Sequence, residues 1–212
     1  MGKKALIIVD VQNDFLPGGA LAVPHGDEVI PLINRMVLLP FDLIIATRDF
    51  HPSHHLSFAS TWGKKVYERV LLDGIEQILW PDHCVQGSAG SEFSSKLDTS
   101  RLQQIVYKGT DLKVDSYSTF FDNERLKSTG LEAYLREQGV DELYVAGLAT
   151  DYCVRYSVQD AIQLGFKPYV VIDACRGVEL QPGDVARAIS EMQQEGAEMI
   201  TTDDVERRLH HV

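Results

Sequence analysis

The stretch ELYVAGLATDYCVRYSVQDAIQLG (142–165) determines the fold class predicted for this chain. It begins with an apolar, β-rich run and passes Thr150, a residue type that caps helices, before a helical pattern that ends at Gly165. A second apolar run, PYVVID (168–173), follows directly. The order strand, helix, strand predicts two parallel strands joined by a crossover helix.

The same alternation of apolar runs and helical patterns continues on both sides of this unit. Strands are predicted at 5–10, 43–47, 103–109, 142–147, 168–173 and 197–201. Helices are predicted around 27–38, at 130–138 between a Thr129 cap and Gly139, at 151–164, and at 183–195 before Gly196. Continuous apolar strands indicate a parallel sheet that is covered on both faces. We therefore expect an α/β chain with three layers, α/β/α, doubly wound around a mainly parallel six-stranded sheet.

Length and composition are typical of a soluble globular protein. The chain has 212 residues, which suits one domain over 1–212, and 44% of them are hydrophobic. The formal net charge of −11 argues against binding to nucleic acid or to anionic membranes. No apolar run approaches the ~20 residues that span a bilayer.

The amino terminus and the cysteines indicate a cytoplasmic protein. The start, MGKKALIIVDV, is basic and then apolar, but Asp10 interrupts it and no small-residue cleavage site follows. Three cysteines without paired spacing, Cys84, Cys153 and Cys175, are typical of a reduced compartment.

Chemically active side chains follow four of the predicted strands. Asp10 ends the first, RDFH (48–51) follows the second, Lys108 ends the third, and GLATDYC (147–153) follows the fourth. In an open parallel sheet, ligands bind outside the carboxyl ends of the strands. The sequence therefore predicts that a carboxylate, an Asp/His pair, a lysine and a cysteine converge at one edge.

Cys153 is the candidate nucleophile. It is predicted in the first turn of a helix, three residues after Thr150, where free N–H groups and the helix dipole would lower the thiol pKa. The same N–H groups could hold a developing oxyanion. The alternative is a small, buried core cysteine.

Asp10 and Lys108 are the candidate partners of this thiol. Asp10 could take the thiol proton and pass it to a leaving amine. Lys108 could pair with Asp10 and steady the negative charge. The alternatives are a structural carboxylate that caps a turn and a surface lysine at a strand end.

Asp49 and His51 form a D-x-H pair that can face one side of an extended segment. Their oxygen and nitrogen atoms suit Zn²⁺, Mn²⁺ or Fe²⁺. A third ligand must come from elsewhere, and the candidates are His83, His54 and His55. His210 and His211 are interpreted as a tail.

At this point the residues resemble the nicotinamidase/pyrazinamidase family, within the isochorismatase-like cysteine hydrolases. The matching segments are ALIIVDVQNDFLPGGALAV (5–23), ATRDFHPSHHLSFAS (46–60), WPDHCVQGSAGSEF (80–93), VYKGTD (106–111), YSTFFDN (117–123) and VAGLATDYCVRYSVQDA (145–161). Their order, spacing and chemistry agree over most of the chain. Phe50 stands where tryptophan is commoner in the family.

The resemblance implies a role for each matching position. It implies a catalytic triad of Asp10, Lys108 and Cys153, and metal ligands Asp49, His51 and His83, with His55 as a possible fourth. It implies a ring-binding pocket of Phe15, Leu21, Trp80 and Tyr117. It also implies an oxyanion hole from the N–H groups of Ala149 and Cys153, with a cis peptide at Leu148–Ala149.

The resemblance further implies a metal-dependent amidohydrolase. Nicotinamide and water would become nicotinate and ammonia through a cysteine thioester, feeding NAD salvage, and pyrazinamide would also be accepted. The implied cofactor is one divalent ion, zinc before iron or manganese, in a monomer or small homo-oligomer. The alternatives are a related ureidoacrylate or carbamoyl amidohydrolase, and a metal- or thiol-binding protein without catalysis.

Overall fold

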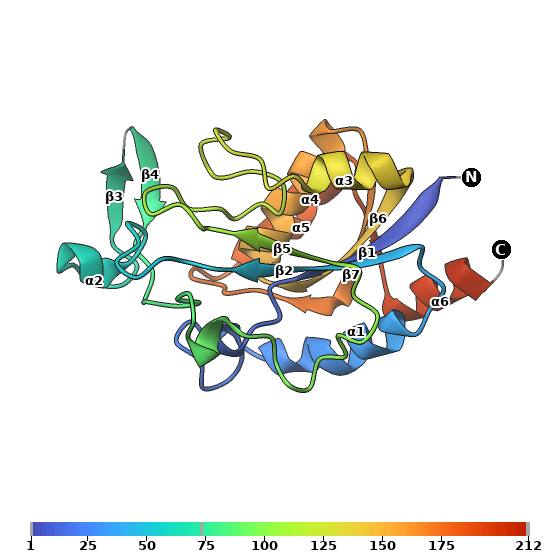
Figure 1. The fold of residues 1–212 in the computed structure, drawn as a ribbon, viewed down its shortest axis with the longest axis horizontal. Helices are drawn as coiled ribbons and strands as arrows, with labels where there is room; N and C mark the ends of the chain where they lie inside the picture. Colours follow the sequence, from blue (N-terminus) through green and yellow to red (C-terminus); the bar gives the residue numbers. More distant parts are fainter. Residues whose placement is uncertain (1, 73, 211–212) are drawn as a thin grey trace.

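The computed structural model describes residues 2–72 and 74–210, and a six-stranded sheet lies at its centre (Figure 1). All five pairings within this sheet are parallel. In spatial order the strands are β5 (Gln104–Lys108), β2 (Leu43–Asp49), β1 (Lys3–Val9), β6 (Val140–Leu148), β7 (Lys167–Arg176) and β8 (Glu198–Ile200). All six predicted strands are confirmed, with ends that differ by a few residues.

The strand order reverses direction between β1 and β6. On one side of β1 lie β2 and then β5, which follow it in the sequence, and on the other side lie β6, β7 and β8 in that order. Such a reversal opens a crevice at the carboxyl ends of the two central strands, which is where open α/β sheets bind ligands.

Helices cover both faces of the sheet, which confirms the three-layer architecture (Figure 1). The helix α1 (Val29–Val37) and the helix α6 (Thr202–His210) lie on one face. The helices α3 (Leu131–Gln138), α4 (Arg155–Gln163) and α5 (Asp184–Glu195) cover the other.

The strand β1 shows why these residues form a doubly covered sheet. Leu6 and Ile8 belong to the core cluster under α1 and α6, whereas Ala5, Ile7 and Val9 belong to the cluster under the other three helices. Successive side chains of a strand point to opposite faces, so a continuous apolar run is buried on both sides.

The predicted helix ends are mostly correct. Gly139 and Gly196 occupy the C-cap positions of α3 and α5 in the left-handed conformation that glycine adopts at low cost. Gly130, rather than Thr129, is the N-cap residue of α3, although the Thr129 hydroxyl still accepts from the Leu131 N–H.

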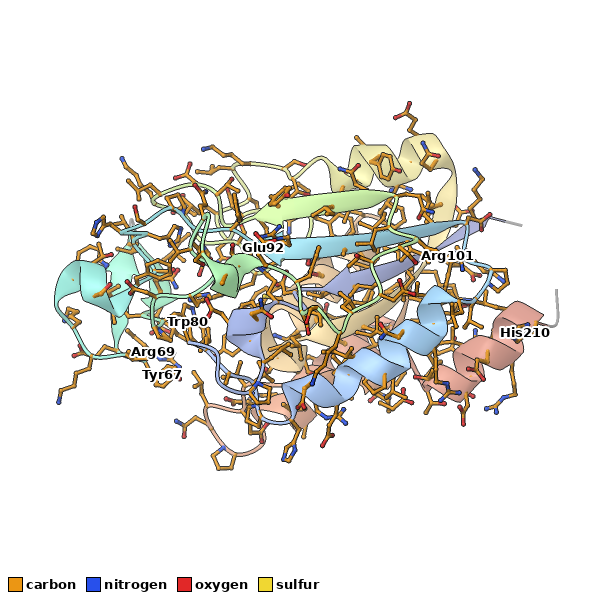
Figure 2. The ribbon with its side chains drawn as sticks, turned by 60° about the horizontal axis from the view of Figure 1, so that its bottom comes forward. Tyr67, Arg69, Trp80, Glu92, Arg101 and His210 are labelled. Atoms are coloured by element: carbon orange, nitrogen blue, oxygen red, sulfur yellow. The ribbon has the colours of Figure 1, made fainter. Side chains whose placement is uncertain are left out.

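Two parts of the fold differ from the sequence-based expectation. The region between β2 and β5, for which no strand or helix was predicted, contains a short helix α2 (Ala59–Trp62) and an antiparallel hairpin of β3 (Arg69–Leu72) and β4 (Ile75–Ile78). The expected tail is partly helical, because His210 is the last residue of α6, while His211 lies outside the described residues. His210 lies at the opposite end of the molecule from Trp80 (Figure 2).

No helix within residues 2–72 and 74–210 is both long enough and apolar enough to cross a membrane.

Candidate functional site

The structure brings together the four chemical groups that follow the predicted strands. Lys108, at the end of β5, lies at their centre. Its ammonium Nζ is 2.7 Å from Asp10 Oδ2, 2.8 Å from Asp49 Oδ1 and 3.4 Å from Cys153 Sγ. It also donates to the Ser116 carbonyl oxygen at 3.2 Å. Because β1, β2, β5 and β6 run parallel, their carboxyl ends place these side chains at one edge of the sheet.

Asp10 is fully buried, and two hydrogen bonds with Thr47 hold it. The Thr47 hydroxyl donates to Asp10 Oδ1 at 2.6 Å, and the Asp10 N–H donates back to the Thr47 hydroxyl oxygen at 3.2 Å. Burial raises the pKa of the Asp10 carboxyl above its ordinary value, although the Lys108 ammonium opposes the shift. Asp10 is therefore oriented as a base with increased proton affinity.

Cys153 follows β6 in a single π-helical turn, Thr150–Val154, that leads into α4. The predicted Thr150 cap is wrong, because Ala149 is the N-cap residue and no side chain caps the turn. The peptide bond between Leu148 and Ala149 is cis, as the resemblance implies. The side chains of Cys153 and Ala149 both line one small pocket.

The Cys153 thiol differs electrostatically from the sequence-based expectation. Burial raises the pKa of this thiol well above its ordinary value, and the nearby Asp10 and Asp49 carboxylates add to the shift, while Lys108 lowers it. The expected lowering of the pKa is wrong, because burial of the thiol raises the pKa by more than the Lys108 ammonium lowers it. The protein therefore holds a neutral thiol that needs a base to become a nucleophile.

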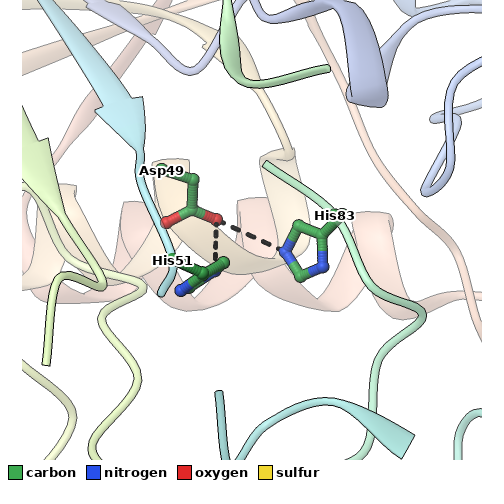
Figure 3. Close-up of side chains that lie close together, drawn as sticks. All are labelled: Asp49, His51 and His83. Atoms are coloured by element: carbon green, nitrogen blue, oxygen red, sulfur yellow. Dashed lines mark ion pairs between the residues drawn. The ribbon is translucent and has the colours of Figure 1, made fainter. Parts of the chain in front are cut away.

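Asp49, His51 and His83 form a candidate metal centre (Figure 3). Asp49 Oδ2 lies 3.3 Å from His51 Nε2 and 3.5 Å from His83 Nε2. One oxygen or nitrogen atom from each of the three residues lies within 4.8 Å of the others, and all three residues are buried.

The hydrogen bonds around the two histidines present the Nε2 atoms to an ion. His51 Nδ1 contacts the Gly109 carbonyl oxygen at 2.9 Å, and His83 Nδ1 contacts the Pro81 carbonyl oxygen at 2.7 Å. A carbonyl oxygen can only accept, so Nδ1 carries the proton and the Nε2 lone pair is free to coordinate. His51 Nε2 is buried and makes no hydrogen bond, although it lies 3.3 Å from Asp49 Oδ2, and a cation bound by both atoms would satisfy them. The donor set therefore fits a divalent transition metal.

The structure separates the two other histidine candidates. His55 is buried, and its ring centroid lies 4.5 Å from that of His51. His55 Nδ1 contacts the Ser57 hydroxyl at 2.7 Å, whereas its buried Nε2 has no partner. His54 is exposed and belongs to neither group of candidate ligands.

The four residues expected to bind a ring line a single pocket beside these groups. The pocket is lined by Phe15, Leu21, Trp80, Tyr117, Tyr152 and Val178, together with Asp49, His83, Asp115, Ala149 and Cys153. Trp80 Nε1 donates to the Tyr117 hydroxyl oxygen at 3.0 Å, and the Trp80 and Tyr152 rings meet edge to face at 5.0 Å. The pocket is therefore lined both by aromatic rings and by Cys153, Asp49 and His83.

Several residues of the site were missed by the sequence analysis. Thr47 was interpreted only as the end of a strand, and Tyr152 as a helix residue. Asp115 lies in a loop whose sequence, LKVDSYS (112–118), has no periodicity that marks it as buried. Of these three residues, only Thr47 could have been recognised from the sequence, because it is a hydroxyl residue near the end of the strand β2, which pairs with β1.

Comparisons with known proteins agree with this geometry. The isochorismatase domain family matches residues 4–204. The chain is 47% identical over 209 residues to a nicotinamidase of Escherichia coli (strain K12), covering 97% of this chain and 98% of that protein.

Two solved structures are also similar. An Acinetobacter baumannii nicotinamidase pyrazinamidase has a TM-score of 0.93 and 43% identity, covering 97% of this chain and 99% of that one. A pyrazinamidase of Pyrococcus horikoshii in complex with zinc has a TM-score of 0.76 and 38% identity, covering 94% and 99% of the two chains.

Proposed function

The chain belongs to the isochorismatase family, and we propose from this premise that it is a nicotinamidase, which hydrolyses nicotinamide to nicotinate and ammonia. The observation that carries the proposal is the position of Lys108. Its ammonium contacts Asp10, Asp49 and Cys153, so a candidate nucleophile, its base and a metal ligand meet beside one aromatic pocket.

A metal ion is part of this proposal. Asp49, His51 and His83 would hold it, with zinc as the first choice because a similar pyrazinamidase is solved with zinc, and iron or manganese as alternatives. When bound, the ion would supply a Lewis acid for the pyridine nitrogen of nicotinamide and so orient the ring.

The pocket residues supply the remaining contacts to the substrate. Phe15 and Trp80 would pack against the pyridine ring, and Leu21 and Tyr117 would complete the wall. Burial raises the pKa of the Tyr117 hydroxyl well above its ordinary value, so this side chain stays neutral. The same pocket would admit pyrazinamide, whose ring has a similar size.

The first half of the reaction forms a thioester. Asp10 would remove the proton from the Cys153 thiol, and the resulting thiolate would attack the amide carbon. The N–H groups of Ala149 and Cys153 would hold the developing oxyanion. Asp10 would then return its proton to the amide nitrogen, the carbon–nitrogen bond would break, and ammonia would leave.

The second half of the reaction releases the product. Asp10 would take a proton from a water molecule, whose oxygen would attack the thioester carbon. The carbon–sulfur bond would break, the Cys153 sulfur would regain a proton from Asp10, and the product would leave as nicotinate after its carboxyl group lost the remaining proton of the water to solvent. Lys108 keeps its positive charge throughout and stabilises the buried carboxylates on either side of it.

The wider setting follows from the proposed reaction. We place the enzyme in the cytoplasm, in the salvage of NAD, as one domain over 1–212 in a monomer or small homo-oligomer. Its partner is the small-molecule substrate.

Ammonia release from nicotinamide tests the proposal directly. Purified, metal-loaded protein should release ammonia and form nicotinate, and release should fall on chelation and recover when metal is returned. A fully metallated protein that releases no ammonia would contradict the proposed substrate. Ureido and carbamoyl compounds would then be tested.

A further inference from the structure

Buried charges around Lys108 do not balance. Three buried carboxylates, those of Asp10, Asp49 and Asp115, surround a site whose buried ammonium is that of Lys108. At their formal charges these four groups leave two negative charges uncompensated. Arg48, the other basic side chain buried nearby on β2, is paired with Glu92 at 2.9 Å. Buried charges are costly unless they are paired or bind a metal.

Of the three carboxylates, Asp115 is the one with which the Lys108 ammonium forms no ion pair. The contacts of the Lys108 ammonium go to Asp10, Asp49, Cys153 and the Ser116 carbonyl oxygen. Asp115 is 4% exposed, its Oδ1 accepts the Ser116 N–H at 2.8 Å, and the same oxygen lies 3.9 Å from His51 Nε2.

Two orphaned nitrogen atoms lie beside this carboxylate. His51 Nε2 and His55 Nε2 are both fully buried and have no hydrogen-bond partner. Candidate ligand atoms of His51, His55 and Asp115 lie within 4.8 Å of one another. His51 is thus shared between this group and the Asp49–His51–His83 group. Because His51 Nδ1 faces the Gly109 carbonyl oxygen, His51 has one nitrogen to offer and can bind one ion.

We propose that Asp115 is a positioning residue of the metal centre, which supplies the second buried negative charge that suits the site to a divalent cation. Asp49, His51 and His83 supply the ligand atoms, and Asp115 acts on the ion through its charge. The inference rests on the metal-dependent function proposed above. A doubly positive ion balances the two uncompensated charges, and the same charges repel one another when the ion is absent.

Removing the Asp115 charge should therefore weaken metal binding but stabilise the metal-free protein. Asp115→Asn keeps an oxygen for the Ser116 N–H and removes one negative charge. Metal affinity should fall about 10–100-fold, the usual effect of altering a group that supports metal ligands. The metal-free protein should become more stable, with a melting temperature raised by about 2–4 °C.

The experiment compares wild type, Asp115→Asn and Asp115→Ser. Each is loaded with Zn²⁺, and its dissociation constant is measured by competition with a chromophoric chelator. Melting temperatures are measured with and without the ion, and the visible spectrum of Co²⁺-loaded protein reports the ligand set. Both variants should bind Zn²⁺ more weakly and melt higher without metal, while the Co²⁺ spectrum keeps its wild-type shape.

Asp160→Asn is the matched control. Asp160 is also a buried carboxylate, but it is paired with Arg125 and belongs neither to the candidate metal ligands nor to the residues that line the pocket. Its neutralisation should leave Zn²⁺ affinity unchanged and lower the melting temperature with and without metal alike.

The outcomes separate this inference from the function on which it rests. Unchanged Zn²⁺ affinity in both Asp115 variants, or a changed Co²⁺ spectrum, would overturn the inference while leaving the metal-dependent function intact. Wild-type protein that binds neither Zn²⁺ nor Co²⁺ would overturn both.

Discussion

The carboxylate of Asp49 is shared between Lys108 and the candidate metal ligands. Its Oδ1 accepts from Lys108 Nζ at 2.8 Å, and its Oδ2 faces His51 and His83. Burial raises the pKa of Asp49, but the Lys108 ammonium and the two histidines together hold it well below its ordinary value. The Asp49 carboxylate therefore contacts both the Lys108–Cys153 group and the candidate metal ligands, and a substitution in one group should alter the electrostatics of the other.

Loss of the nucleophile should abolish turnover and leave the metal in place. In Cys153→Ala we expect ammonia release to fall by more than about 10³-fold, because no thioester can form. Metal content, measured by elemental analysis, should match that of wild type. Cys175→Ala is the control, since Cys175 is also buried but lies in β7 and does not line the pocket. Normal turnover in Cys153→Ala would exclude the covalent route.

Loss of a metal ligand should reduce metal content and substrate affinity together. His51→Ala removes the buried Nε2 atom that faces the Asp49 carboxylate, so we expect Zn²⁺ content to drop and KM for nicotinamide to rise. His54→Ala changes an exposed neighbour and should behave as wild type. A His51→Ala protein with full metal content would remove His51 from the ligand set.

The raised pKa values of Asp10 and Cys153 predict how activity falls at acidic pH and how slowly the thiol reacts with an alkylating reagent. Asp10 works as a base only when it is deprotonated, so kcat/KM should fall as the pH decreases. Because burial raises the pKa of Asp10, this fall should be centred at a pH above 3.8, the ordinary pKa of an aspartate. The Cys153 thiol, whose pKa is raised, should react slowly with iodoacetamide near pH 7 and faster as the pH rises. Rapid alkylation at pH 7 of protein freed of metal would show that the thiolate is already formed.

Thr47 should set the orientation of Asp10. Thr47→Val removes a 2.6 Å hydrogen bond to the Asp10 carboxylate, a type of bond worth about 1.5–3 kcal/mol. We expect kcat to fall roughly tenfold or more, with KM little changed, since Thr47 is not among the pocket residues. Thr47→Ser keeps the hydroxyl and should restore most of the activity. Equal losses in both variants would indicate a packing defect.

A substitution in the core under α3 should lower the stability of the protein without lowering its catalytic rate. Leu135 is fully buried in the cluster between α3 and the sheet, so Leu135→Ala should lower the free energy of unfolding by about 2–5 kcal/mol. At temperatures where the variant is folded, kcat should match wild type. Urea unfolding and ammonia release measure the two quantities. A large fall in kcat for folded protein would mean that α3 affects the site.

The six strands could be predicted because each is a short apolar run with helical patterns around it. The burial of Ala5, Leu6 and Ile7 on alternating faces leaves a continuous hydrophobic signal that local sequence carries by itself. The β3–β4 hairpin was missed because its strands have four residues each and expose Leu71 and Ile75. Such strands have no apolar pattern to recognise.

The sequence by itself determined which residues follow the strands, and so predicted that Asp10, Asp49, Lys108 and Cys153 would meet, because parallel strands end at one edge. The roles assigned to them stay predictions. Tertiary structure alone decided the state of the thiol, since desolvation depends on all the atoms that pack around Cys153. It also decided the placement of Asp115, which a loop without local pattern brings to His51. Burial and charge balance arise from contacts between distant segments, and no short stretch of sequence contains them.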